Sequence, residues 1–396
     1  MMNLRKALPI LILVLVLIAS MTTTAMASQN VRIVIDGSNI KSDVAPVIEN
    51  GRTLVPAKVI FENLGAKVNW NANKKEVTVT TAATDVSLVI DSKTAKIDGK
   101  NVTLDVPARI INGRTFIPLK FIADAVGAKV SWNAGTSTVD IKYFTDMQGT
   151  VKIGGSTTLQ PISQAAADVL MKKNPGKLSV TVTGGGSGNG VKGGASGEYN
   201  IGNVSREIKD AEKTEYRDLQ DFQIGSDGIA IIIHKNNSVK NLTKQQVFDI
   251  FTGKIKNWSE VGGSNAPIFV QTREAGSGTL GAFVELALDP IQKDQQVVVT
   301  ATPHSSNPGV KQAVAKEVNA IGFLSFGHID NSIKTLSIDG VEPTVANALN
   351  KKYPIVRPLV VCTKGRPSGA TAKLIDFFTS PEGKKIIDKE DFISLP

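Results

Sequence analysis

Apolar and polar residues follow two different rhythms along this 396-residue chain, and the pattern changes near residue 150. Before that point, short alternating runs such as residues 76–80 predict small strands. Beyond it, strands predicted over 151–153 and 178–183 alternate with helices predicted over 159–173 and 280–288, where apolar residues recur three and four positions apart. Strands that alternate with helices are typical of an α/β domain.

The first residues carry the pattern of a secretory signal peptide. Arg5 and Lys6 precede an apolar run over 7–19, and Ala25-Met26-Ala27 forms a small-residue cleavage site. The apolar run is shorter than the roughly 20 residues that span a bilayer. No cysteine stands near the cleavage site, so the lipid anchor common among exported binding proteins of single-membrane (Gram-positive) bacteria has no attachment point. We therefore expect a signal peptide over 1–27 and a secreted, extracellular protein held at the cell surface or wall by other means.

An internal repeat follows the signal segment. Residues 51–70 (GRTLVPAKVIFENLGAKVNW) recur as 113–132 (GRTFIPLKFIADAVGAKVSW), with an offset of 62. The duplicated region, bounded at 28–145, resembles the small domain named after the N-terminal region of copper amine oxidases. Residues 31–142 contain no His, Cys or Met, so the ligands that copper prefers are absent. The resemblance implies a stalk-like or wall-associated α+β spacer, in which Arg52 and Arg114 either contact cell-wall polymer or hold a turn.

Composition narrows the classes of partner. A net charge of +9 suits an anionic ligand or an anionic wall, whereas an aromatic content of 5% argues against the stacking platforms that bind nucleic acid. The single cysteine, Cys362, excludes a disulfide framework. The three histidines, at positions 234, 304 and 328, are interpreted as surface or packing residues.

Three segments combine glycine with hydroxyl side chains, at 154–158 (GGSTT), 184–188 (GGGSG) and 273–279 (REAGSGT). The first and third run directly into predicted helices. The first N–H groups of a helix lack partners and lie at the positive end of its dipole, and glycine lets the backbone approach a ligand closely. Arg273 adds a planar fork suited to a tetrahedral oxyanion. The segments therefore predict an oxyanion site, with hydroxyl donors at Ser156, Thr157, Thr158, Ser187, Ser277 and Thr279.

Over 150–396 the chain resembles the phosphate-binding proteins of bacterial ABC uptake systems. The motifs that carry the resemblance are GGSTTLQP at 154–161, TGGGSGNGVK at 183–192, IGNVSREIKD at 201–210, FDIFTGKIKNW at 248–258, REAGSGT at 273–279, AIGFLS at 320–325 and YPIVRPL at 353–359. The resemblance implies a two-lobed periplasmic-binding-protein-like fold of type II. We expect lobe 1 over 150–226 and 340–396 and lobe 2 over 227–339, closing on inorganic phosphate and delivering it to the permease subunits of an ABC transporter.

One motif departs from the family pattern. Well-known members carry an aspartate soon after the glycine of the fourth motif, where this chain has Ser205 and Arg206. That aspartate accepts the proton of hydrogen phosphate, which sulfate lacks. We hypothesise that Asp227 takes this role, the alternative being a turn aspartate, and that Arg206 either adds a cation to the site or pairs with Glu207 or Asp210. The predicted site is completed by Arg273, Ser277, Gly278 and Thr279.

Other classes fit less well. An exported hydrolase is the main alternative, but none of Ser156, Ser187 and Ser277 lies in a G-x-S-x-G elbow. A phosphate-loop NTPase would need G-x-x-x-x-G-K-[ST], which does not occur, and no cluster of His and carboxylates suggests a metal. We expect a binding protein without catalysis, metal or cofactor. A wall-held scavenger or sensor that does not serve a transporter is the second interpretation.

Overall fold

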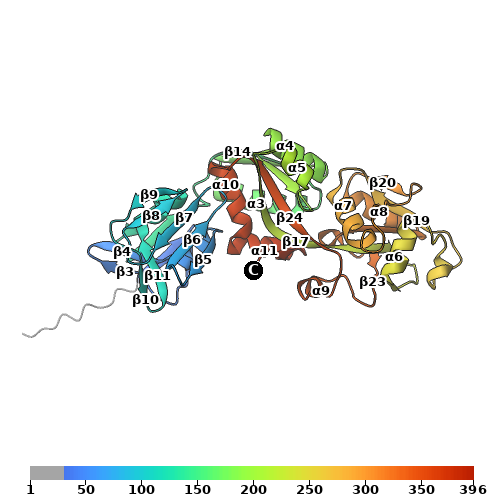
Figure 1. The fold of residues 1–396 in the computed structure, drawn as a ribbon, viewed down its shortest axis with the longest axis horizontal. Coiled ribbons are helices and arrows are strands. Elements are labelled where there is room, and N and C mark those ends of the chain that lie inside the picture. Colours follow the sequence, from blue (N-terminus) through green and yellow to red (C-terminus); the bar gives the residue numbers. More distant parts are fainter. Residues whose placement is uncertain (1–30) are drawn as a thin grey trace, which may run out of the picture.

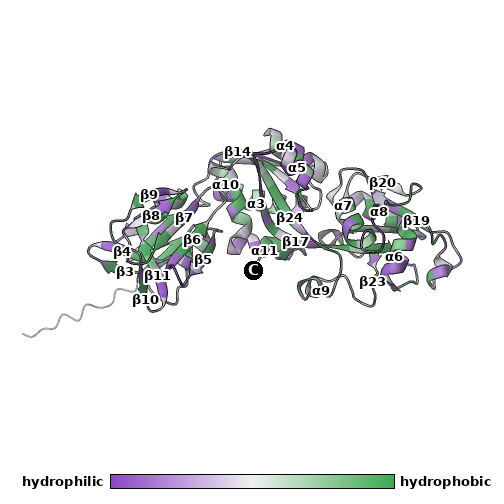
Figure 2. Cartoon of the chain, in the orientation of Figure 1, coloured by the Kyte–Doolittle hydropathy of each residue, from purple (hydrophilic) through white to green (hydrophobic). Residues whose placement is uncertain are grey.

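The computed structural model describes residues 31–396 and shows an N-terminal module, lobe 1 and lobe 2 in a row (Figure 1). The signal peptide predicted over 1–27 lies outside the described residues. Apolar residues are concentrated on the central strands of all three bodies (Figure 2). Within residues 31–396, no helix combines the length and apolar character that crossing a membrane requires.

The N-terminal module consists of three small antiparallel or mixed sheets and two short helices. The strand orders are β12-β13-β1-β2, β10-β11-β4-β3 and β5-β6-β7-β8-β9. The elements are β1 (Arg32–Ile35), β2 (Ser38–Ile40), β3 (Val47–Glu49), β4 (Arg52–Pro56), α1 (Ala57–Asn63), β5 (Lys67–Asn71), β6 (Glu76–Thr80), β7 (Asp85–Val89), β8 (Thr94–Ile97), β9 (Lys100–Thr103), β10 (Arg109–Ile111), β11 (Arg114–Pro118), α2 (Leu119–Val126), β12 (Lys129–Asn133) and β13 (Thr138–Lys142).

The two repeats face each other across the β4–β11 pair, which lies at the centre of its sheet. Arg52 of the first repeat pairs with Asp105 of the second at 2.9 Å, and Arg114 of the second pairs with Asp43 of the first at 2.6 Å. Both arginines are exposed, and their ion pairs are reciprocal. The structure thus gives each arginine a contact that joins one repeat to the other.

The module packs against lobe 1 through a buried polar contact and a shared apolar core. Asp376 accepts hydrogen bonds from the Ala82 N–H and from the Tyr143 hydroxyl, both at 2.7 Å. Burial raises the pKa of this carboxyl to about 7. Phe144 and Phe377 meet edge to face beside it. One hydrophobic core runs from the module into lobe 1, whereas lobe 2 has a core of its own.

The two lobes share one long sheet path, β15-β14-β16-β24-β17-β21-β19-β20. Lobe 1 contains β14 (Gly149–Gly155), α3 (Gln160–Lys173), β15 (Leu178–Gly184), α4 (Ser187–Ser196), β16 (Ile201–Val204), α5 (Asp210–Glu215), α10 (Gly369–Thr379), α11 (Pro381–Lys389) and β25 (Ile393–Ser394). Lobe 2 contains β18 (Asn241–Leu242), α6 (Lys244–Phe251), η1 (Trp258–Val261), β19 (Phe269–Arg273), α7 (Gly278–Phe283), the π-helical turn η2 (Val284–Leu288), β20 (Thr302–His304), α8 (Asn307–Lys316), β21 (Ala320–Ser325), η3 (Phe326–His328), β22 (Ile333–Thr335), β23 (Ser337–Ile338) and α9 (Val345–Leu349).

Two long strands connect the lobes, β17 (Leu219–His234) and β24 (Val356–Lys364). The first half of β17 pairs with β24, and its second half pairs with β21 of lobe 2. Ala348 and Tyr353 lie in the core of lobe 2. The chain therefore returns to lobe 1 at β24, later than the boundary near residue 340 that the sequence suggests.

The second glycine segment also opens a helix, α4, where the sequence indicated helices after the first and third only. Helix propensity does not predict this helix, because four of its ten residues are glycine, which is a poor helix former. Packing explains them: a Cβ on Gly190 would lie 2.2 Å from the backbone oxygen of Asn203 in β16. The helix sits so close to the sheet that only glycine fits there.

Candidate oxyanion-binding site

The three glycine segments converge where the lobes meet. Each connects a strand to a helix: β14 to α3, β15 to α4 and β19 to α7. The second and third touch directly, because the Gly188 N–H donates to the Gly276 oxygen at 2.9 Å. A Cβ on Gly278 would lie 2.1 Å from the Ser187 hydroxyl. The starts of helices from both lobes thus come together at one place, where their first N–H groups can face an anion.

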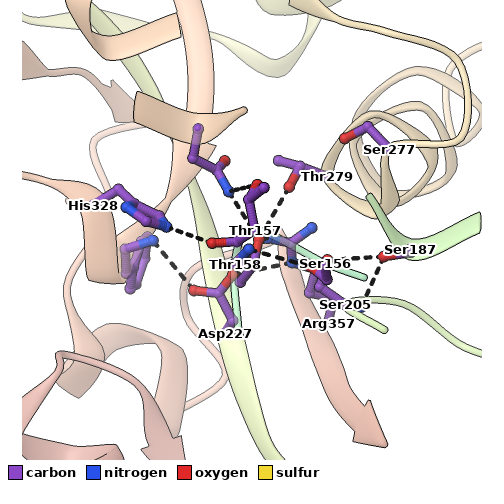
Figure 3. A network of polar contacts seen from close by, with 12 residues as sticks. Ser156, Thr157, Thr158, Ser187, Ser205, Asp227, Ser277, Thr279, His328 and Arg357 are labelled. Atoms are coloured by element: carbon purple, nitrogen blue, oxygen red, sulfur yellow. Dashed lines mark hydrogen bonds and ion pairs between the residues drawn. The ribbon is translucent and has the colours of Figure 1, made fainter. Parts of the chain in front are cut away.

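A cluster of buried hydroxyls lies between these helix ends (Figure 3). Ser205 Oγ lies 2.9 Å from Ser156 Oγ and 3.4 Å from Ser187 Oγ. Thr158 Oγ1 of lobe 1 lies 3.3 Å from Thr279 Oγ1 of lobe 2. Hydroxyls can turn to donate toward an anion or toward one another, so this cluster is adaptable.

Ser277 contributes mainly to local structure. It is the N-cap of α7, and its hydroxyl accepts from the Leu280 N–H at 3.3 Å. Gly278 begins the helix and is buried. Both residues lie beside the hydroxyl cluster, where the backbone N–H groups of α7 begin.

Arg273 brings a guanidinium from lobe 2 to lobe 1. It donates to the carbonyls of His304 and Ser305 at 3.1 and 3.0 Å, and to Thr157 Oγ1 at 3.4 Å. Its Nη1 is buried and has no hydrogen-bond partner among residues 31–396. Burial, and then repulsion from Arg357, lowers the pKa of Arg273 to about 10, so the side chain remains a cation at neutral pH.

Arg357 is a buried cation that sequence reasoning did not single out. It lies opposite Asp227 in the register of β24 and β17, with its Nε and Nη2 donating to Asp227 Oδ2 at 3.0 and 2.7 Å. Nη2 also donates to Thr158 Oγ1 at 3.0 Å, and Nη1 is buried without a partner. The only signal in the sequence was the YPIVRPL motif, which contains this arginine.

Asp227, the predicted acceptor, is the counter-ion of Arg357 in the structure. Its Oδ2 takes both bonds from Arg357, and its Oδ1 accepts from the Phe326 N–H at 3.2 Å. Burial raises the pKa of this carboxyl against the opposing effect of the arginine. Both oxygens of Asp227 therefore already accept hydrogen bonds within the protein.

Arg206 is buried and pairs with a carboxylate other than the two considered from the sequence. Its Nη1 and Nη2 donate to the two oxygens of Glu212 at 2.8 and 2.7 Å, and Nη1 also donates to the Glu207 carbonyl. Burial acts to raise the pKa of Glu212, but the hydrogen bonds from Arg206 and from the Lys209 N–H, together with the two positive charges, lower it. Neither Asp210 nor the Glu207 carboxylate is its partner.

Asn307 and His328 also join the lobes, and sequence reasoning did not single out Asn307. Asn307 Nδ2 donates to Thr157 Oγ1 and Thr158 Oγ1 at 3.3 and 3.0 Å. His328, interpreted from sequence as a packing or surface residue, contacts the Thr157 carbonyl through Nε2 at 3.1 Å (Figure 3). Burial lowers the pKa of His328 to about 4, which keeps the ring neutral.

The groups of the site are suited to holding a tetrahedral anion. Among residues 31–396, no group of three or more His, Cys, Asp or Glu could hold a metal ion. Cys362 is buried, and burial raises the pKa of its thiol to about 12. The site is made of hydroxyls, helix starts and guanidinium groups, which bind oxyanions by charge-assisted hydrogen bonds.

Comparison with known proteins agrees with this geometry. The family model for the PBP superfamily domain matches residues 143–382, and that for the copper amine oxidase N-terminal domain matches 34–141. Phosphate-binding protein PstS of Bacillus subtilis is 35% identical over 249 residues, which cover 62% of this chain and 81% of the relative. PstS of Pseudomonas aeruginosa PAO1 is 28% identical over 311 residues, and the match covers 72% of this chain and 95% of the relative.

Solved structures show the same likeness. A substrate-binding protein of Clostridium perfringens, assigned to phosphate ABC transport and solved with phosphate bound, is 40% identical with a TM-score of 0.59. The match covers 63% of this chain and all of that one. An ABC-type phosphate transport receptor of Vibrio cholerae is 32% identical with a TM-score of 0.52, covering 62% of this chain and all of the receptor. The chain thus belongs to the phosphate-binding proteins of the PBP superfamily, with an N-terminal domain of the copper amine oxidase type.

Proposed function

We propose that this protein captures inorganic phosphate outside the cell membrane and delivers it to the permease subunits of an ABC importer. Its family consists of substrate-binding proteins, which carry out no chemistry on the ligand. The observation that supports phosphate best is the cluster of buried donors from both lobes, in which Nη1 of Arg273 and Nη1 of Arg357 have no hydrogen-bond partner in the part of the chain that the structure describes. A buried donor without a partner costs about 1–3 kcal/mol or more, and an oxyanion between the lobes would remove that cost.

The proposed ligand contacts come from the residues that the structure brings together. The hydroxyls of Ser156, Thr157, Thr158, Ser187, Ser205 and Thr279, the helix start at Ser277 and Gly278, and the guanidinium of Arg273 form the binding group. Arg357, held by Asp227, supplies a further donor. Arg206 forms an ion pair with Glu212, so its charge is already compensated.

Calorimetric titration tests this proposal. Purified protein stripped of phosphate is titrated with phosphate and then with sulfate, at one pH above and one below neutrality. Of the three site arginines, Arg206 and Arg357 each form an ion pair, whereas Arg273 has no carboxylate within ion-pair distance in residues 31–396. We therefore expect Arg273→Gln to abolish measurable phosphate binding. Arg366→Gln is the matched control, because Arg366 forms ion pairs only at the exposed junction with the module. Phosphate binding that is absent from the wild type, or equal in the Arg273 variant, would refute the assignment.

Delivery and location need separate tests. We propose that residues 1–27 direct export and that the N-terminal module associates with cell-wall polymer, leaving the protein at the surface of a Gram-positive cell. Deleting the gene should abolish high-affinity phosphate uptake if the protein serves an importer, whereas unchanged uptake would favour a scavenger or sensor. Deleting residues 31–142 should release the protein from a washed cell-wall fraction if the module binds the wall. Retention of the shortened protein would contradict that role.

A further inference from the structure

A phosphate site needs an acceptor as well as donors, and this inference rests on the proposed function. Hydrogen phosphate carries a proton that must find an acceptor when the anion is buried, whereas sulfate has none. A site that pairs with that proton rejects the analogue lacking it, because a buried polar group would then remain unpaired. The question is which oxygen in this protein accepts the proton.

The carboxylates of the site are already used. Asp227 accepts from Arg357 and from the Phe326 N–H, and Glu212 accepts two bonds from Arg206. The position beside Ser205 carries Arg206, a donor. Both oxygens of each carboxylate thus already accept a hydrogen bond, and a side-chain oxygen that accepts none is found in a different kind of group.

Three buried side-chain oxygens that can only accept hydrogen bonds have no partner in the described residues: those of Asn203, Asp289 and Asn307. Asn203 directs its amide to Ser163 of α3, below the first glycine segment. Asp289 lies beyond the far end of the helix that begins at Gly278. Asn307 alone of the three bonds to the site hydroxyls.

The Asn307 amide presents its nitrogen to Thr157 and Thr158. Thr158 Oγ1 accepts from Arg357 Nη2, accepts from Asn307 Nδ2 at 3.0 Å and pairs with Thr279 Oγ1. A hydroxyl has two lone pairs and one proton, so with both lone pairs accepting, from Arg357 and from Asn307, the Thr158 proton remains for Thr279 or for a bound anion. The amide nitrogen of Asn307 then faces the threonines, and its oxygen is left without a bond.

We propose that Asn307 Oδ1 accepts the hydrogen bond from the protonated oxygen of bound phosphate and so selects hydrogen phosphate over sulfate. The acceptor is neutral, which matters because Arg206 and Arg357 are each neutralised by a carboxylate and only Arg273 of the three keeps an uncompensated charge. A free carboxylate at this position would offset the charge of Arg273 and repel a dianion. An amide oxygen accepts the proton without doing so, and it does not titrate.

The test compares phosphate and sulfate affinities within each variant, so that the fraction of active protein cancels from the ratio. Asn307→Ala should weaken phosphate binding about 10- to 100-fold, the range expected when a buried hydrogen bond to a charged group is lost. Sulfate affinity should stay the same or rise. Asn307→Asp keeps an acceptor oxygen at the same place and should retain the preference for phosphate. Asn265→Ala, an exposed asparagine on lobe 2, is the matched control and should behave as the wild type.

Two results would overturn the inference. If Asn307→Ala weakens phosphate and sulfate by the same factor, Asn307 only positions Thr157 and Thr158. If neither affinity changes, the acceptor lies elsewhere. Failure of the wild type to bind phosphate is a different outcome, because it rejects the proposed function before selectivity is measured. Asn307→Ser provides a second, smaller change should the alanine variant not fold.

Discussion

Replacing Asp227 by asparagine should strongly destabilise the protein, because it leaves the Arg357 charge buried without its counter-ion. The side chain of Arg357 is 1% exposed and that of Asp227 is 0% exposed, with 2.7 Å between Nη2 and Oδ2. At an effective dielectric constant of about 20, two unit charges at that distance attract by about 6 kcal/mol. Asparagine keeps one oxygen that can still accept a hydrogen bond, so part of this is recovered.

We therefore expect Asp227→Asn to lower the free energy of unfolding by about 3–5 kcal/mol, the usual cost of breaking a buried pair. At about 2–4 °C per kcal/mol for a domain of this size, the melting temperature should fall by about 6–20 °C. The measurement is urea and thermal unfolding followed by circular dichroism in phosphate-free buffer, because a bound ligand would add stability of its own.

An exposed ion pair provides the control. Asp339 and Lys244 lie 3.8 Å apart with side chains that are 43% and 61% exposed, and Asp339→Asn should cost less than about 1 kcal/mol. The double variant Asp227→Asn with Arg357→Met should be more stable than Asp227→Asn alone, since it removes the unpaired charge. If the Asp227 variant loses no more stability than the control, the ion pair does not hold the connecting strands and the reasoning fails.

Three further predictions concern pH and packing. Burial raises the pKa of Asp376 to about 7, so its favourable contribution, present below about pH 4, is lost as pH rises through 7. Urea unfolding should show Asp376→Asn gaining up to about 4 kcal/mol over the wild type between pH 4 and 8, and parallel pH profiles would contradict this. Burial lowers the pKa of His328 to about 4, so the stability that the neutral ring contributes is present above about pH 6.5 and is lost as pH falls toward 4; the free energy of unfolding of the wild type relative to His328→Gln should drop by up to about 3 kcal/mol over that range, and parallel urea profiles would count against it. Gly190→Ala should cost about 1–3 kcal/mol because its Cβ would meet the Asn203 oxygen, whereas Gly188→Ala, with ordinary contacts in the same helix, should not; equal melting temperatures would disprove the packing argument.

The sequence predicted the alternation of strands and helices and the glycine segments because these depend on local chemistry. It could not place Arg357 against Asp227, since the two are 130 residues apart and meet only through the register of β17 and β24. Asn307 was missed for a similar reason: SSNPGV indicates a helix start, and only the closed arrangement of lobes brings its amide to Thr158. Helix α4 was hidden because packing against β16, rather than propensity, selects its glycines.

The junction between the module and lobe 1 has a mechanical consequence. Within residues 31–396, no hydrogen bond or ion pair joins residues 31–142 to lobe 2, while Arg366 and Asp376 tie the module to lobe 1. Within the described residues, lobe 1 and the module are therefore joined by polar contacts and a shared hydrophobic core, and lobe 2 connects to the module through lobe 1. Attaching the protein to a surface through its module would leave lobe 2 without a direct contact to the point of attachment, which suits a surface-bound sensor that reads a change in lobe 2.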